Sequence, residues 1–183
     1  PQDSLTSGNL MPWYPYGVEV YYFIDTLTFP DTGQYEITWY DCCRNHAIQN
    51  MSNPGSEEMY LRNVVTVTDS SNPNSSPLFL VPPVVFLPIQ TPWQYNPLPF
   101  DPDGDSLVWS IVTPLSFNGS LVNGYTLPAY DTSGPYSIDP VTGTITWTAS
   151  TIGNWDAAVL IEEFRNGVKI GEMRRDMQYI TVS

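Results

Sequence analysis

The chain has 183 residues, of which 6 are basic and 19 acidic, and its formal net charge at pH 7 is −13. This excess of acid excludes the basic footprint of nucleic-acid binding and argues against attraction to anionic lipid surfaces. The 18 prolines and 12 glycines argue against long helices, whereas 14% aromatic residues favour strands.

The first predicted strands lie in the N-terminal part of the chain. Residues 34–41 alternate in character, with Tyr35, Ile37 and Trp39 on one face of the expected strand. The other strands expected here are Gly17–Ile24 and Tyr60–Thr68. We interpret the N-terminus as a cut inside a longer protein, and we expect this first segment to be incomplete there.

A polar segment, Asp69–Pro77, follows these strands. It is rich in serine, asparagine and proline and carries no apolar side chain to bury, which is typical of a linker. The sequence therefore predicts two parts, residues 1–72 and residues 73–183.

The second part contains short strands separated by turns. Asn166-Gly167 is the strongest hairpin signal, because both central residues of a type I′ turn need a positive φ. Six or seven strands within roughly 105 residues, with turns between them, predict a β-sandwich. The core residues we expect are Trp109, Ile111, Ile145, Trp147, Val159 and Ile161.

Three carboxylates alternate in the turn formed by Asp101, Asp103 and Asp105. A tight loop can bring their oxygens to one point, where like charges about 4 Å apart repel by roughly 4 kcal/mol at an effective dielectric near 20. Hard oxygen ligands in such a loop suit calcium, although the EF-hand spacing is absent and further ligands must come from elsewhere. The candidates are Glu163, Asp176, Glu162 and the linker residues Asp69, Asn72 and Asn74. The alternative is a solvated surface turn.

Several segments together resemble known repeats. Asp69–Phe79 resembles the linker between cadherin repeats, and Asp101–Leu107 resembles the acidic turn of bacterial cadherin-like repeats. Ile138–Trp147 is similar to a strand pair of the same repeats. The segments that resemble a repeat of large Bacteroidota surface adhesins, of the gliding-motility kind exported by the type IX pathway, are Tyr40–Asn45, Asn74–Pro77, Glu163–Gly167 and Arg175–Gln178.

The resemblance implies an all-β chain in which an Ig-like segment, residues 1–72, precedes a cadherin-like β-sandwich, residues 73–183. It implies calcium at Asp101, Asp103 and Asp105, with Asp176 as a further ligand. The chain would then be a structural or adhesive repeat of a secreted protein on the bacterial cell surface. Its expected partners are neighbouring repeats of the same chain and surface glycans or other adhesive ligands.

Cys42 and Cys43 are the only cysteines. Neighbouring residues on a strand point to opposite faces, so a vicinal disulfide competes with two separate thiols. A zinc site is not expected, because His46 is the only histidine and zinc needs four ligands.

No catalytic constellation stands out, and we expect no enzyme and no membrane insertion of this segment. The alternative function is a carbohydrate-binding module, in which exposed aromatic side chains stack on sugar rings. Its candidates are Trp13, Trp93 and Tyr95, although aromatic side chains in proline-rich stretches are more often part of the core.

Overall fold

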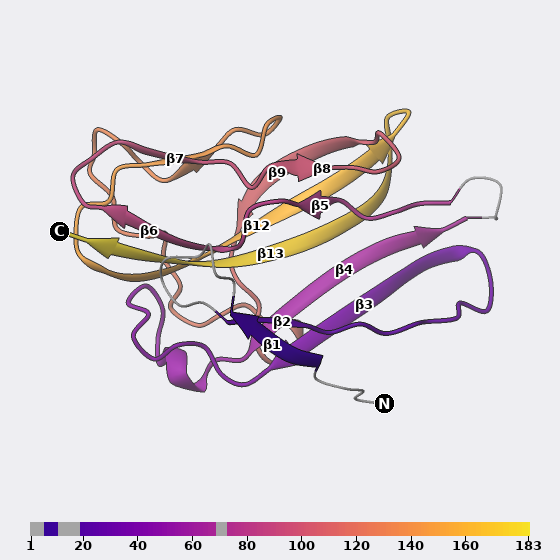
Figure 1. Cartoon of the computed structure of the whole chain (residues 1–183), viewed down its shortest axis with the longest axis horizontal. Coiled ribbons are helices and arrows are strands. Elements are labelled where there is room, and N and C mark those ends of the chain that lie inside the picture. Colours follow the sequence, from indigo (N-terminus) through magenta and orange to yellow (C-terminus); the bar gives the residue numbers. More distant parts are fainter. Residues whose placement is uncertain (1–5, 11–18, 69–72) are drawn as a thin grey trace. The chain divides into compact units, whose positions relative to one another are not determined.

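The computed structural model describes residues 6–10, 19–68 and 73–183, and the elements within them are β-strands and two 3-10 helices (Figure 1). The predicted all-β class is confirmed. The chain forms two compact units, Pro1–Asp31 and Thr32–Ser183. Among the described residues, no helix is long and apolar enough to cross a membrane.

The first unit contains one antiparallel pair, β1 (Thr6–Leu10) and β2 (Glu19–Tyr22). The register is interrupted between Thr6 and Asn9.

The second unit is built on a long hairpin, β12 (Gly153–Arg165) and β13 (Val168–Val182), which pair along their length. The predicted turn is confirmed, because Asn166 and Gly167 join the two strands with φ of 53° and 79°. Positive φ is cheap for these two residue types, so the local sequence defines this turn.

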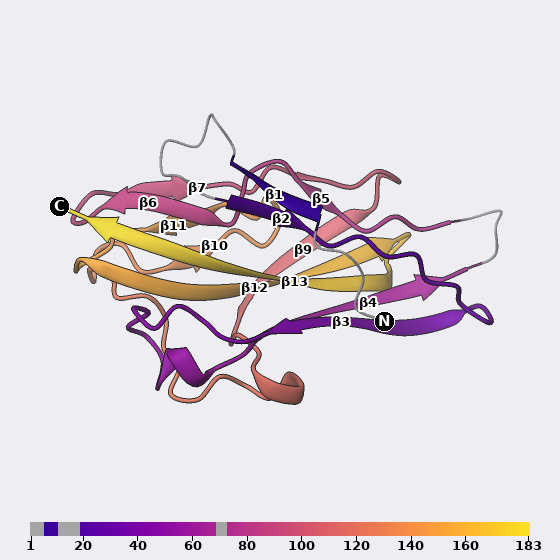
Figure 2. The ribbon, with the colours of Figure 1, turned by 60° about the horizontal axis from the view of Figure 1, so that its bottom comes forward.

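Four further strands complete the main sheet. β4 (Met59–Val67) pairs with the first part of β13, and β3 (Gly33–Asp41) pairs with β4. β9 (Ser106–Val112) pairs with β12, and β6 (Val84–Pro88) runs parallel to the end of β13. In Figure 2 the paired strands β3 and β4 lie below the β12–β13 hairpin, and β6 lies above it.

A second layer consists of three short strands, β7 (Trp93–Tyr95), β11 (Ile145–Trp147) and β10 (Ser137–Ile138). β5 (Leu78–Phe79) and β8 (Pro99–Phe100) form a separate pair. The 3-10 helices are η1 (Pro54–Ser56) and η2 (Phe117–Gly119).

The core lies between this second layer and the main sheet, and it is rich in aromatic rings. Trp147 packs edge to face on Tyr136 and Tyr179, at centroid distances of 5.7 and 5.5 Å. Such contacts add to the burial of apolar area. The predicted core is confirmed: five of its members are buried and Ile111 packs against them.

The structure divides the chain at a different place from the predicted boundary at residues 72 and 73. β4 precedes the linker, yet it hydrogen-bonds to β13 at Val65, Val64 and Asn63. Residues 32–68 therefore share a sheet with the strands that follow the linker. Local composition could not reveal this pairing, because the partners are about a hundred residues apart in sequence.

Candidate functional site

The acidic turn between β8 and β9 is wound around one carboxylate. Asp101 Oδ1 accepts the backbone N–H groups of Asp103 and Asp105 at 2.9 and 3.0 Å. As a result, carboxylate oxygens from Asp101, Asp103 and Asp105 lie within 4.8 Å of one another. The structure therefore brings together the three predicted ligands of the turn.

The residues that end the linker lie against this turn. The Ser75 backbone N–H donates to Asp103 Oδ2 at 2.6 Å. Arg165, at the end of β12, donates to both carboxylate oxygens of Asp105 at 2.8 and 2.6 Å and to Asn74 Oδ1 at 2.8 Å. These hydrogen bonds from Arg165 hold the pKa of Asp105 below its usual value. Linker, turn and hairpin end thus meet at one place.

Glu163 is the fourth carboxylate of this cluster. Its side chain is 2% exposed, and its Oε1 has no hydrogen-bond partner among the described residues. Burial raises the pKa of Glu163 to about 7; the nearby charges of Asp101 and Asp105 raise it further, while a hydrogen bond with Asn74 opposes the shift. The predicted grouping of Glu163 with the acidic turn is what the structure shows.

The cluster has more acidic groups than basic ones. Among the described residues, the cluster has four carboxyl groups, on Asp101, Asp103, Asp105 and Glu163, and one guanidinium group, that of Arg165. Asp101 Oδ2, like Glu163 Oε1, is buried and has no hydrogen-bond partner within the part of the chain that the structure describes. Buried carboxylate oxygens without a partner are costly, and hard oxygen donors of this kind are the ligands that calcium prefers. The residues present therefore fit a divalent cation.

Asp176 does not join this cluster, and its assignment as a calcium ligand needs correction. In the hairpin Asp176 is paired with Ala158, whereas Glu163 is paired with Gly171. The five-residue separation along β13 corresponds to about 17 Å, and an odd separation puts the side chain on the opposite face. Asp176 is instead held by Arg44 through two hydrogen bonds of 3.0 and 2.7 Å.

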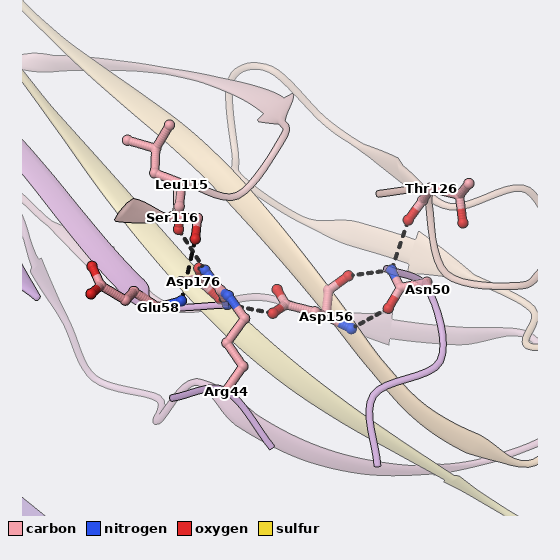
Figure 3. Close-up of polar contacts among 8 residues, drawn as sticks. All are labelled: Arg44, Asn50, Glu58, Leu115, Ser116, Thr126, Asp156 and Asp176. Atoms are coloured by element: carbon pink, nitrogen blue, oxygen red, sulfur yellow. Dashed lines mark hydrogen bonds and ion pairs between the residues drawn. The ribbon is translucent and has the colours of Figure 1, made fainter. Parts of the chain in front are cut away.

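Arg44, Asp156 and Asp176 form a buried ionic network that the sequence analysis missed (Figure 3). Arg44 Nη1 donates to Asp156 Oδ2, and Nη2 also donates to the Leu115 carbonyl oxygen at 2.9 Å. The Asn50 side-chain amide donates to the Asp156 carbonyl oxygen at 2.8 Å and accepts the Asp156 backbone N–H at 2.9 Å. The network ties the segment around residues 44–50 to the outer face of the hairpin.

This network has two carboxylates for one guanidinium. Burial raises the pKa of Asp156 well above its usual value; the neighbouring Asp176 raises it further, and Arg44 opposes the shift. The only signal in the sequence was an aspartate within the apolar run of β12. That signal does not name its partner, because Arg44 lies 112 positions away.

Cys42 and Cys43 are both exposed, and the structure joins them as a vicinal disulfide. They directly precede the buried Arg44. Their redox state in the protein stays a prediction.

The aromatic candidates for sugar binding differ in position. Trp13 lies outside the described residues. Tyr95 is buried, and its hydroxyl donates to the Pro82 carbonyl oxygen at 2.9 Å, so its ring is part of the core and does not offer a stacking surface. Trp93 is half-buried; it stacks on Tyr95 at 5.8 Å and borders a surface hollow.

Comparisons with known proteins give little further information. No family model and no curated protein matches the chain. A solved structure of Sidekick-1 immunoglobulin domains 1–4 is similar, with 9% sequence identity and a TM-score of 0.31. The match covers 81% of this chain and 40% of that one. At that level the likeness carries no argument about function.

Proposed function

We propose that this chain is a structural or adhesive module of a secreted bacterial surface protein, and that calcium bound at the acidic turn stiffens it. The observation that carries the calcium proposal is a pair of buried oxygens, Asp101 Oδ2 and Glu163 Oε1, without hydrogen-bond partners among the described residues. They lie in the cluster formed by Asp101, Asp103, Asp105 and Glu163. The bacterial surface location and the adhesin kind are supported by the sequence motifs alone.

The arrangement suits a mechanical role because the cluster lies where three segments meet. Ser75 and Asn74 come from the linker, Asp101–Asp105 from the turn, and Glu163 and Arg165 from the hairpin end. A cation shared by these segments would cross-link residues that are distant in sequence. A force applied to the linker would then be transmitted to the hairpin.

Each residue has a distinct part in this proposal. Asp101 organises the turn through Oδ1 and offers Oδ2 to the cation. Glu163 offers its buried Oε1 to the cation. Arg165 neutralises Asp105 without an ion, so calcium binding would have to share or displace that contact. Calcium supplies the missing positive charge and tolerates irregular oxygen geometry, whereas magnesium demands a near-ideal octahedron.

The test is thermal unfolding of the whole chain with excess calcium, with excess magnesium and with a chelator. Binding to the folded state alone adds RT ln(1 + [L]/Kd), about 2.7 kcal/mol at a hundredfold excess over Kd. We expect millimolar calcium to raise the melting temperature and magnesium to do less. Identical melting in all three conditions would remove the calcium proposal.

A pair of isosteric variants makes the test specific. Asp101→Asn keeps an oxygen for the two backbone N–H groups but replaces the unpartnered oxygen with an amide, so the calcium response should disappear. Asp139→Asn is the matched control, because Asp139 Oδ1 also accepts two backbone N–H groups, from Val141 and Thr142, in an exposed turn. Its calcium response should equal that of the unmodified chain.

The surface location is tested separately, by antibody labelling of intact and permeabilised cells of the source organism. We expect equal labelling in both. Labelling that requires permeabilisation would exclude the adhesin role but leave the calcium site standing.

A further inference from the structure

The outer face of the three-stranded layer carries a second feature, independent of the acidic turn. A hollow of about 870 Å³ lies there, which is within the size range of small-ligand sites. Its lining includes Trp93, Gln94, Asp131, Ser137 and Thr146. Unlike the calcium cluster, it combines aromatic, amide and hydroxyl groups with a single ionisable side chain.

Three polar side chains form a row across this layer. Ser137 on β10 is paired with Thr146 on β11, which is paired in turn with Gln94 on β7. These positions alternate with the core positions Ile145 and Tyr95, so the row faces away from the core. Neighbouring strands are about 4.8 Å apart, so the row spans about 10 Å. That length suits an extended ligand with repeated hydrogen-bonding groups.

Asp131 stands at one wall of the hollow and is fixed in place. Its Oδ1 accepts both the backbone N–H and the hydroxyl of Ser133, at 2.9 and 2.7 Å. The Asp131 backbone N–H donates to the Thr148 carbonyl oxygen, and the Thr148 N–H donates to the Gly134 carbonyl oxygen. The second carboxylate oxygen makes no hydrogen bond with the described residues, so a rigid acceptor faces solvent beside the row.

Gly134 allows this wall to lie close to the sheet. A Cβ atom at position 134 would come within 2.2 Å of the Thr148 hydroxyl oxygen. At the other wall, Gln90 has a φ of 56°, a left-handed conformation that residues with a Cβ rarely adopt. Strained or closely packed backbone of this kind concentrates where ligands bind.

We propose that this hollow binds a neutral oligosaccharide segment, with Gln94, Thr146 and Ser137 bonding its hydroxyl groups and Asp131 accepting from one of them. The ionised Asp131 and the net charge of −13 disfavour anionic glycans. A peptide ligand usually adds to an open sheet edge. Here the hydrogen-bonding groups are side chains on a sheet face. The inference does not depend on calcium or on the adhesin role.

The test is a glycan array of neutral and anionic oligosaccharides probed with the whole chain, followed by calorimetric titration with the neutral hexasaccharides of glucose, xylose and mannose and with an anionic oligogalacturonate. We expect at least one neutral glycan to bind and the anionic one not to bind. The absence of neutral binding at millimolar concentration, or a preference for the anionic glycan, overturns the proposal.

Three surface variants connect binding to the hollow. Gln94→Ala removes an exposed amide from the row, and Asp131→Asn retains the oxygen that Ser133 needs. Each should weaken binding at least tenfold without changing the melting temperature. Gln34→Ala is the matched control, since Gln34 is an exposed glutamine on β3 of the other sheet. Equal affinities for all three variants would place the sugar elsewhere and overturn the proposal.

Discussion

Replacing Arg44 tests the structure most directly, because the replacement leaves two buried carboxylates without their cationic partner. In the chain its side chain is 3% exposed, and those of Asp156 and Asp176 are 2% and 4% exposed. Breaking a buried pair by deleting one partner typically costs about 3–5 kcal/mol. Since a domain of this size is stable by only about 5–15 kcal/mol, Arg44→Met should remove about a fifth or more of its stability.

Arg62 is a natural control for this experiment. It also contacts two carboxylates, on Glu36 and Glu172 at 2.7 Å each, but its side chain is 34% exposed. Exposed ion pairs contribute about 0–1 kcal/mol, so Arg62→Met should have a small effect. Urea unfolding at pH 7 measures both, and the midpoint should fall far more for Arg44→Met at an unchanged slope. Equal losses for the two variants would refute the buried network.

The pH dependence of the unfolding free energy is a second test of the same network. The pKa of Asp156 is higher in the folded chain than the unfolded value near 3.9. The folded state therefore binds more protons between those two values, and this contribution to stability is lost as pH rises through the window. Asp156→Asn should flatten that part of the profile, measured by urea unfolding in steps of pH. An unchanged slope would mean that Asp156 is ionised throughout.

Three other predictions concern packing, turns and thiols. Trp147→Ala should cost about 3–5 kcal/mol by thermal unfolding, whereas Val141→Ala at an exposed site should change little; equal effects would contradict the core assignment. Gly167→Ala should cost about 1–2 kcal/mol, since its φ is 79° in open space, and Gly143→Ala should cost more, since its Cβ would come within 2.6 Å of the Trp109 ring; the reverse order would refute this packing. Denatured, unreduced protein should show no titratable thiol if Cys42 and Cys43 are joined, and two titratable thiols would exclude the bridge.

Local patterns predicted the parts of the fold that local physics determines. The Asn166-Gly167 turn follows from backbone preference, and the burial of Trp147 and Ile145 follows from two-residue alternation. The grouping of Asp101, Asp103 and Asp105 follows from their spacing in one turn. In each case the determining residues are close together in sequence.

Long-range pairing accounts for what the sequence did not reveal. The β4–β13 ladder and the Arg44–Asp156 pair both join residues about a hundred positions apart. Asp176 was assigned to calcium because it is acidic and lies on the returning strand. The strand register excludes Asp176 from the acidic cluster. A shift of five residues moves a side chain along the hairpin and also onto the opposite face of the sheet.

The two carboxylate clusters now differ in one physical respect, which is where their positive charge comes from. The Asp156–Asp176 pair, on the outer face of the hairpin, has an internal cation in Arg44 and a carboxyl group whose pKa is raised. The cluster around Glu163, on the core side and near the turn, has four carboxyl groups and, among the described residues, one cationic side chain, Arg165. A chelator should therefore loosen the linker around Ser75 while the segment around Arg44 stays docked. Hydrogen exchange with and without calcium measures both segments in one experiment, and equal loss of protection in both would contradict this division.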